Sequence, residues 1–93
     1  MPRYAYANGR FLPHDRAVVH IEDRGYQFAD GVYEVIPVNA GRCVDEAAHL
    51  DRLERSLSEL SIPMPMSRRA LSLVARELMQ RNGLTRGFVY MQV

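Results

Sequence analysis

Two consecutive stretches of the chain, residues 45–60 and 67–81, carry apolar side chains at helical spacing. A stripe that recurs every three or four residues is typical of an amphipathic α-helix. The stripes consist of Leu50, Leu53, Leu57 and Leu60 in the first stretch and of Leu71, Val74 and Leu78 in the second. Because a helix with one apolar side must bury that side, these two helices have to pack against another layer.

The residues at the ends of both stretches favour the same two helices. Asp45 and Ser67 are residue types whose side-chain oxygen caps a helix N-terminus. Pro63 lies beyond the end of the first stretch. Gly83 follows the second, at a place where a helix commonly ends in a left-handed residue.

The N-terminal part of the chain predicts short strands. Asn8-Gly9 lies between the runs 4–7 and 10–12 and favours a type I′ hairpin turn, since both turn positions need positive φ. Residues 17–21 are rich in β-branched side chains and predict another short strand. The polar residues 22–25 predict a turn or loop.

Residues 31–39 predict a strand with two chemically different faces. Two-residue alternation places Tyr33, Val35 and Pro37 on one face and Val32, Glu34 and Ile36 on the other. Because proline has no N–H to donate, we expect the strand to be unpaired there, at a sheet edge or a bulge. Further along, the sequence predicts a turn at 40–41, a return strand at 42–44 and a last strand at 88–93.

The order of strands, two helices and a strand predicts an α+β fold. We expect a two-layer sandwich, in which the two amphipathic helices cover one face of a largely antiparallel sheet. A chain of 93 residues is long enough for one domain at most. Since the apolar strand 88–93 reaches the last residue, we also expect the chain to be part of a longer protein.

The composition excludes several classes of partner. The formal net charge is +1 and the acidic residues are interleaved with the basic ones, so we expect no nucleic-acid-binding face. No apolar run approaches the roughly 20 residues of a membrane span, and the N-terminus lacks the apolar stretch of a signal peptide. Cys43 is the single cysteine and cannot form an intrachain disulfide, which favours a cytoplasmic location.

All twelve residues counted as lysine or arginine are arginines, so the sequence contains no lysine. Within these residues this excludes Schiff-base catalysis by a side-chain amine, a Walker A phosphate loop and a Ser–Lys dyad. Arginine cannot replace lysine in such roles, because it stays protonated and offers no free amine.

Two groups of polar residues could carry chemistry. His, Asp and Glu side chains gather between residues 14 and 23, but their spacing matches no zinc motif, and we expect no metal. His49 and Arg52 are three residues apart near the start of a predicted helix, where a forked guanidinium and free helix N–H groups suit a phosphate. Spacing alone favours the alternative, a surface pair on a solvated helix.

Two segments together resemble a known family. Residues 22–36 read EDRGYQFADGVYEVI and are followed by HLDRL at 49–53. This combination resembles the class IV, fold-type IV aminotransferases, which use pyridoxal phosphate, and within them the D-amino-acid (D-alanine) aminotransferases. Branched-chain aminotransferases usually carry a different first block, and aminodeoxychorismate lyases share the DRG-x-x-F-x-DG core. Both remain alternatives.

The resemblance implies a homodimeric enzyme of two domains, with the cofactor between them. Residues 1–93 would form most of the smaller, N-terminal domain. In the family, the arginine at the position of Arg52 binds the cofactor phosphate, and the histidine at the position of His49 lies near the catalytic centre. The tyrosine at the position of Tyr33 helps to hold the substrate carboxylate, and the residue at the position of Val35 lines the same pocket.

Two neighbouring positions bear on this assignment. Glu34 points to the opposite face of the strand, so we do not expect it to pair with the pyridine nitrogen of the cofactor. Pro37 differs from the side chain expected at that pocket-facing position, which leaves the substrate preference open.

The resemblance places the Schiff-base lysine of the family beyond Val93, in a C-terminal domain. We therefore expect no catalytic residue within this chain, and no activity of the chain alone. The full-length enzyme would transfer an amino group from a D-amino acid, such as D-alanine, to a 2-oxo acid, such as 2-oxoglutarate. An alternative of a different class is a non-catalytic module that uses the fold for binding or dimerisation.

Overall fold

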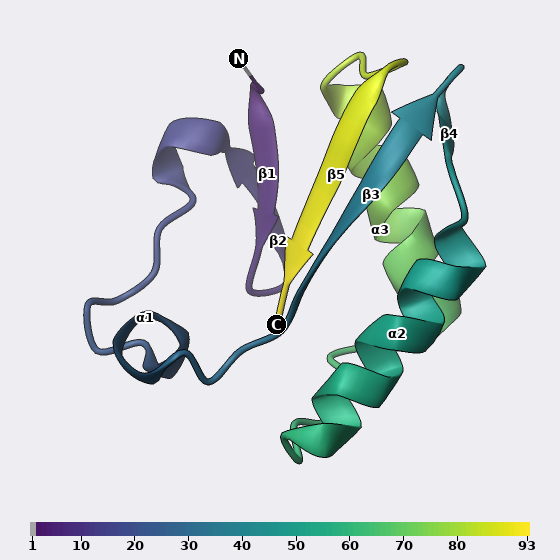
Figure 1. The fold of residues 1–93 in the computed structure, drawn as a ribbon. Coiled ribbons are helices and arrows are strands. Elements are labelled where there is room, and N and C mark those ends of the chain that lie inside the picture. The colour runs from purple at the N-terminus through teal and green to yellow at the C-terminus, as the bar shows by residue number, and fades with distance from the viewer. Residues whose placement is uncertain (1) are drawn as a thin grey trace.

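The computed structural model describes residues 2–93 and confirms the α+β architecture. In chain order the elements are β1 (Tyr4–Ala7), β2 (Arg10–Pro13), the 3₁₀ helix η1 (His14–Arg16), α1 (Arg24–Phe28), β3 (Tyr33–Asn39), β4 (Arg42–Cys43), α2 (Glu46–Glu59), α3 (Arg68–Arg81) and β5 (Gly87–Gln92). The strands form an antiparallel pair, β1-β2, and a three-stranded antiparallel sheet in the order β4-β3-β5. Figure 1 shows α2 and α3 beside the larger sheet.

Strand β3 is central in the larger sheet and has the two faces that its sequence predicts. Glu34, Ile36 and Val38 are buried, whereas Tyr33 and Val35 on the alternate positions are exposed. The face with Glu34 therefore belongs to the interior of the chain, and the face with Tyr33 is open.

The missing N–H of Pro37 does not interrupt the ladder between β3 and β5. Val32 and Val93 exchange both backbone hydrogen bonds, at 3.0 and 2.9 Å. In an antiparallel ladder this turns the N–H positions of the odd-numbered β3 residues away from β5. On that other side the N–H of Val44, just after β4, donates to the carbonyl of Pro37 over 2.8 Å. The prediction that the strand is unpaired at Pro37 is therefore wrong: β3 is the central strand, and Pro37 pairs with Phe88 of β5. Only the one hydrogen bond that the proline nitrogen cannot donate is missing from the sheet.

Both long helices pack against the buried face of the larger sheet. Leu50, Leu53 and Leu57 of α2 form one core cluster with Val32. A second cluster joins the sheet to α3 through Val38, Val89, Ala75 and Met79. The predicted stripe of α2 is confirmed for its first three leucines, and Leu60 at the helix end is exposed. In α3 the buried positions, Ala75 and Met79, lie one residue on from the predicted Val74 and Leu78.

The ends of the helices follow the sequence signals in most details. The Ser67 hydroxyl accepts a hydrogen bond of 3.1 Å from the N–H of Ala70, and Gly83 after α3 has the positive φ of 59°. Asp45 lies at the N-cap of α2, but in a left-handed conformation and without a side-chain cap bond.

The N-terminal hairpin is confirmed and is held to α3. Asn8 and Gly9 have φ values of 50° and 87°, as a type I′ turn requires. The side chain of Asn82, just after α3, accepts hydrogen bonds from the N–H groups of Arg3 and Tyr4 at 2.7 and 3.0 Å. It also donates to the carbonyl of Tyr4. At the start of β1, the Asn82 side chain therefore makes backbone hydrogen bonds of the kind that a neighbouring strand would make.

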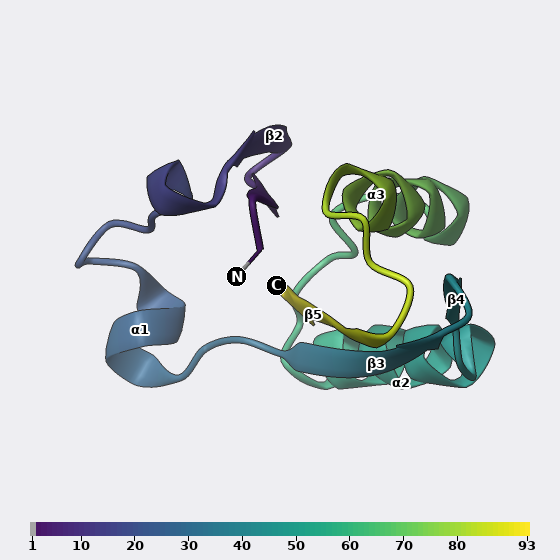
Figure 2. The same cartoon turned by 90° about the horizontal axis from the view of Figure 1, so that it is seen from above.

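Two predictions for the segment after the hairpin are wrong. Residues 17–21 form no strand, and Arg24 and Gly25, predicted as part of a turn, begin the short helix α1. Strand propensity depends on packing against neighbouring strands, and no described strand pairs with residues 17–21, where Val18 and Ile21 are largely exposed. Helix α1 lies apart from α2 and α3 in both views (Figures 1 and 2).

Candidate functional site

A buried carboxylate joins β3 to α2. Glu34 is only 3% exposed. Arg52 donates from Nε to Oε2 and from Nη2 to Oε1 of this carboxylate, each over 2.8 Å. Nδ1 of His49 lies 2.7 Å from Oε1. The two predicted cofactor-binding residues are therefore brought together, on an acidic residue that the sequence did not assign to them.

Local rules explain why these three side chains meet. Alternation along β3 turns Glu34 toward the helices. His49 and Arg52 are three residues apart and therefore lie on the same side of α2. Burial of Leu50 and Leu53 holds this part of α2 against the sheet.

The charge of Glu34 is stabilised by its partners. The hydrogen bond from Arg52 lowers the pKa of Glu34 most strongly, burial opposes it, and the contact with His49 lowers the pKa again. The net result is a pKa of about 2, against an ordinary value of 4.5. Since a carboxylate only accepts hydrogen bonds, Nδ1 of His49 carries the proton in this contact.

The predicted substrate-binding residues lie on the other face of β3. Tyr33 is 63% exposed, and Val35 is also exposed. The ring of Tyr33 is stacked on that of Tyr90 from β5, with centroids 5.8 Å apart and planes at 17°. The pKa of Arg52 is raised by the hydrogen bond to Glu34 and then by the charge of Glu34. Tyr33 and Val35 therefore lie on the face of β3 opposite to Glu34, the residue that binds His49 and Arg52.

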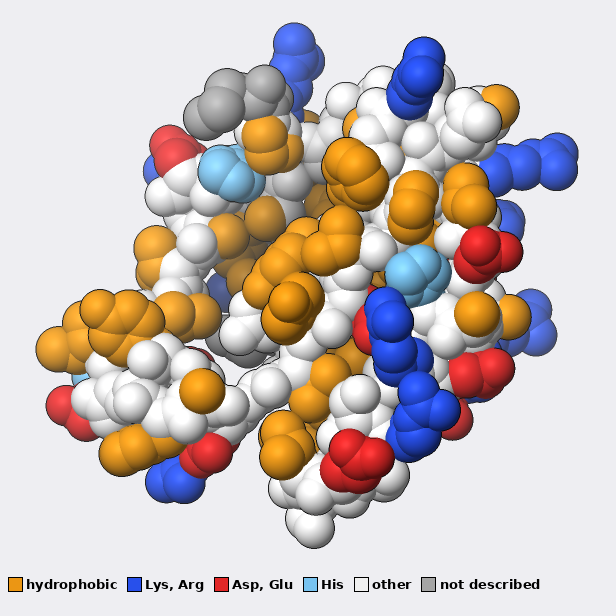
Figure 3. All heavy atoms as spheres, viewed as in Figure 1, with side chains coloured by type: hydrophobic (Ala, Val, Ile, Leu, Met, Phe, Trp, Pro, Cys, Tyr) orange, Lys and Arg blue, Asp and Glu red, His pale blue; other side chains and the backbone are white. Residues whose placement is uncertain are grey.

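A polar groove follows α2 past the ion pair. It has a volume of about 350 Å³ and is lined by Asp45, Ala48, His49, Asp51, Arg52 and Arg55. Figure 3 shows arginine side chains and a histidine gathered over α2, beside apolar side chains over β3 and β5. An anionic ligand at this border would meet cationic groups on one side and an apolar surface on the other.

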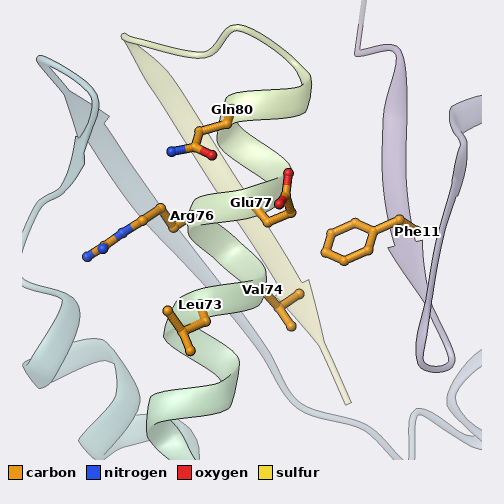
Figure 4. Close-up of a pocket in the computed structure, with 6 residues that line it drawn as sticks. All are labelled: Phe11, Leu73, Val74, Arg76, Glu77 and Gln80. Carbon is orange, nitrogen blue, oxygen red and sulfur yellow. The ribbon is translucent and has the colours of Figure 1, made fainter.

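A second groove, of about 370 Å³, lies between the N-terminal hairpin and α3. In Figure 4, Phe11 points from the hairpin toward Val74 and Glu77, whereas Arg76 points away. Its polar side chains do not converge on one point, so this groove offers no comparable site.

The role of Glu34 is the part of the site that sequence reasoning missed. Alternation placed Glu34 on the helix-facing side of the strand, and a buried carboxylate is rarely found without a cationic partner. The nearest candidate partners on a covering helix are the spaced pair His49 and Arg52. These two signals, taken together, could have predicted the cluster.

The described residues offer no metal site, no membrane-spanning helix and no reactive cysteine. Among residues 2–93, no group of three or more His, Cys, Asp or Glu side chains is placed to hold a metal ion. In this same range, no helix combines the length and apolar character that crossing a bilayer requires. Burial, and then Glu46, raises the pKa of the half-buried Cys43 thiol to about 11, which keeps it protonated and unreactive.

The lowered pKa of Glu34 predicts a specific pH dependence of stability. A carboxyl group with a depressed folded-state pKa stabilises the fold above its unfolded pKa, and this contribution is lost as the pH falls toward the folded value. We expect the difference in unfolding free energy between wild type and Glu34→Gln to be constant above pH 4.5 and to shrink between about pH 4.5 and 2. Denaturant titrations across this range test it, and a difference that stays constant down to pH 2 would contradict it.

Comparison with known proteins shows the family to which the chain belongs. The family described as Amino-transferase class IV matches residues 31–93. D-alanine aminotransferases of Listeria innocua serovar 6a and Bacillus licheniformis are 38% and 41% identical to the chain over 86 residues. In both cases the alignment covers 92% of this chain and 30% of the relative, so the chain spans less than a third of these relatives' length.

Solved structures show the same fold. The branched-chain amino acid aminotransferase of Escherichia coli matches with a TM-score of 0.85 and 21% identity, over 91% of this chain and 29% of that chain. The branched-chain aminotransferase of the archaeon Thermoproteus uzoniensis, solved with norvaline, gives a TM-score of 0.77 and 22% identity, over 91% and 30% of the two chains. The expected fold type is confirmed, and the chain belongs to the class IV aminotransferases.

Proposed function

We propose that this chain is most of the N-terminal domain of a pyridoxal-phosphate-dependent D-amino-acid aminotransferase. The complete enzyme moves an amino group from a D-amino acid, such as D-alanine, to a 2-oxo acid, such as 2-oxoglutarate. The observation that carries the proposal is the placement of Arg52 and His49 side by side on the Glu34 carboxylate. Identity of 38–41% to proteins described as D-alanine aminotransferases supports the substrate class.

The hydrogen-bond donors of Arg52 fit a phosphate group. A guanidinium has five N–H donors, and two of them point to Glu34, which leaves three for another acceptor. The side chain of Arg52 is 57% exposed, so a ligand can reach it. In our proposal Arg52 binds the cofactor phosphate, and His49 lies beside the cofactor. Bound pyridoxal phosphate supplies an electron sink for the bonds at the α-carbon of the amino acid.

Tyr33 and Val35 are the proposed substrate contacts. Both lie on the open face of β3, where the Tyr33 hydroxyl can donate to a substrate carboxylate and Val35 can form an apolar wall. Since the sequence has no lysine, the lysine that bonds to the cofactor belongs to a C-terminal domain outside residues 1–93. The proposal includes a cytoplasmic homodimer as the complete enzyme.

The decisive test is the reaction of the full-length protein. We expect pyruvate and glutamate to form when the purified protein receives D-alanine, 2-oxoglutarate and pyridoxal phosphate, and to form much more slowly from L-alanine. Transamination of L-leucine instead would indicate a branched-chain aminotransferase. Pyruvate release from aminodeoxychorismate without an oxo acid would indicate a lyase. A full-length protein that binds no cofactor would support the non-catalytic module.

Arg52→Ala in the full-length protein is expected to weaken pyridoxal phosphate binding by about ten- to a hundredfold, because a charge-assisted contact to the phosphate is lost. Equilibrium titration of the apoenzyme with the cofactor measures the effect. Arg55→Ala is the matched control, since Arg55 lines the same groove one helical turn further along. Equal affinities of wild type and Arg52→Ala would remove Arg52 from the cofactor site.

Tyr33→Phe is expected to lower kcat/KM for the amino-acid substrate by about ten- to a hundredfold while cofactor affinity stays unchanged, because the variant loses one hydroxyl donor to the carboxylate. Steady-state kinetics with D-alanine and a cofactor titration separate the two effects. Tyr4→Phe on the N-terminal hairpin serves as the control. Loss of cofactor affinity with intact substrate kinetics would place Tyr33 elsewhere.

A further inference from the structure

The contacts of Glu34 determine how Arg52 can be presented to a ligand. The carboxylate binds one edge of the guanidinium, at Nε and Nη2. Two parallel hydrogen bonds of this kind fix the plane of the guanidinium as well as its position. The opposite edge, with both N–H groups of Nη1 and the second one of Nη2, is then turned away from Glu34.

His49 is fixed by the same carboxylate. Its Nδ1 shares the Oε1 atom with Nη2 of Arg52. Because Nδ1 carries the proton in that contact, Nε2 is the nitrogen left for another partner. One buried group therefore determines both the orientation of Arg52 and the hydrogen-bonding pattern of His49.

The burial of Glu34 makes this arrangement rigid. Exposed ion pairs lose much of their orientation to side-chain motion and contribute little. Glu34 is 3% exposed. Its strand is hydrogen-bonded to β5 and covered on the Glu34 face by α2, so its carboxylate has a fixed location. A fixed acceptor under a half-exposed arginine is the arrangement expected of a group that supports a ligand-binding side chain.

We propose that Glu34 is a positioning residue for the cofactor phosphate, which holds the Arg52 guanidinium with its free edge outward and keeps His49 beside it. This inference rests on the proposed function, since it assumes that Arg52 binds the phosphate of pyridoxal phosphate. Glu34 itself contacts neither cofactor nor substrate.

The test compares pyridoxal phosphate with pyridoxal, which lacks the phosphate, in titrations of the full-length apoenzyme. Glu34→Gln keeps the shape of the side chain but removes its charge and places an amide N–H₂ group near the guanidinium. We expect this variant to bind pyridoxal phosphate about tenfold more weakly and to bind pyridoxal with unchanged affinity. Glu46→Gln, which removes another carboxylate of α2 that bonds to Ser72 instead, should change neither.

A double variant shows whether Glu34 acts through Arg52. In the Arg52→Ala background, adding Glu34→Gln should cause no further loss of pyridoxal phosphate affinity, because the two changes disable the same contact. Additive losses would overturn the inference, as would equal weakening of pyridoxal and pyridoxal phosphate by Glu34→Gln. If Glu34→Gln fails to fold, Glu34→Asp tests the same point, since the shorter carboxylate cannot keep both contacts and should also weaken only pyridoxal phosphate.

The outcomes also separate this inference from the proposed function. A wild-type protein that does not bind pyridoxal phosphate contradicts the proposed function. A wild type that binds it, an Arg52→Ala variant that binds it weakly and a Glu34→Gln variant with wild-type affinity contradict only the role of Glu34.

Discussion

The bidentate ion pair between Glu34 and Arg52 is the interaction on which the arrangement of the site depends. Burial of the α2 leucines drives the helix onto the sheet, but hydrophobic burial is non-directional and does not fix the orientation of a polar side chain. A carboxylate at 3% exposure requires a partner at a defined place. Arg52 donates two hydrogen bonds of 2.8 Å to this carboxylate. Packing of the leucines therefore holds α2 against the sheet, and the ion pair orients the Arg52 side chain.

Because side chains alternate along β3, the residues that pack against the helices and the proposed substrate contacts lie on opposite faces of the strand. Its even-numbered residues, with Glu34 and Ile36, face the helices and hold the layers together. Its odd-numbered residues, with Tyr33 and Val35, face outward beside Tyr90. The position of the open face therefore depends on how α2 packs, because neighbouring residues of β3 share one backbone and point to opposite faces of the sheet. Pro37 is accommodated in this strand, since its nitrogen faces away from β5 and its carbonyl still accepts a hydrogen bond from the N–H of Val44.

Much of the fold was predictable because its signals are local. The turn at Asn8-Gly9, the cap at Ser67 and the leucines of α2 each depend on residues within about one turn of each other. The same holds for the spacing of His49 and Arg52, which placed them on one side of α2. Residues 17–21 had no such support. Their β-branched composition favours a strand only where a neighbouring strand exists, and the described chain provides none there.

The pairing of Glu34 with Arg52 lay beyond local rules for a different reason. The two residues are 18 positions apart, on different elements, so no periodicity relates them directly. The link is an energetic requirement: alternation turns the carboxylate inward, an inward carboxylate is unfavourable alone, and the helix that covers it must supply a cation. Arg52 is the residue of α2 that satisfies this requirement, with His49 beside it. An acidic residue on the helix-facing side of a strand is therefore a long-range signal, because it indicates where a basic residue of the covering layer must lie.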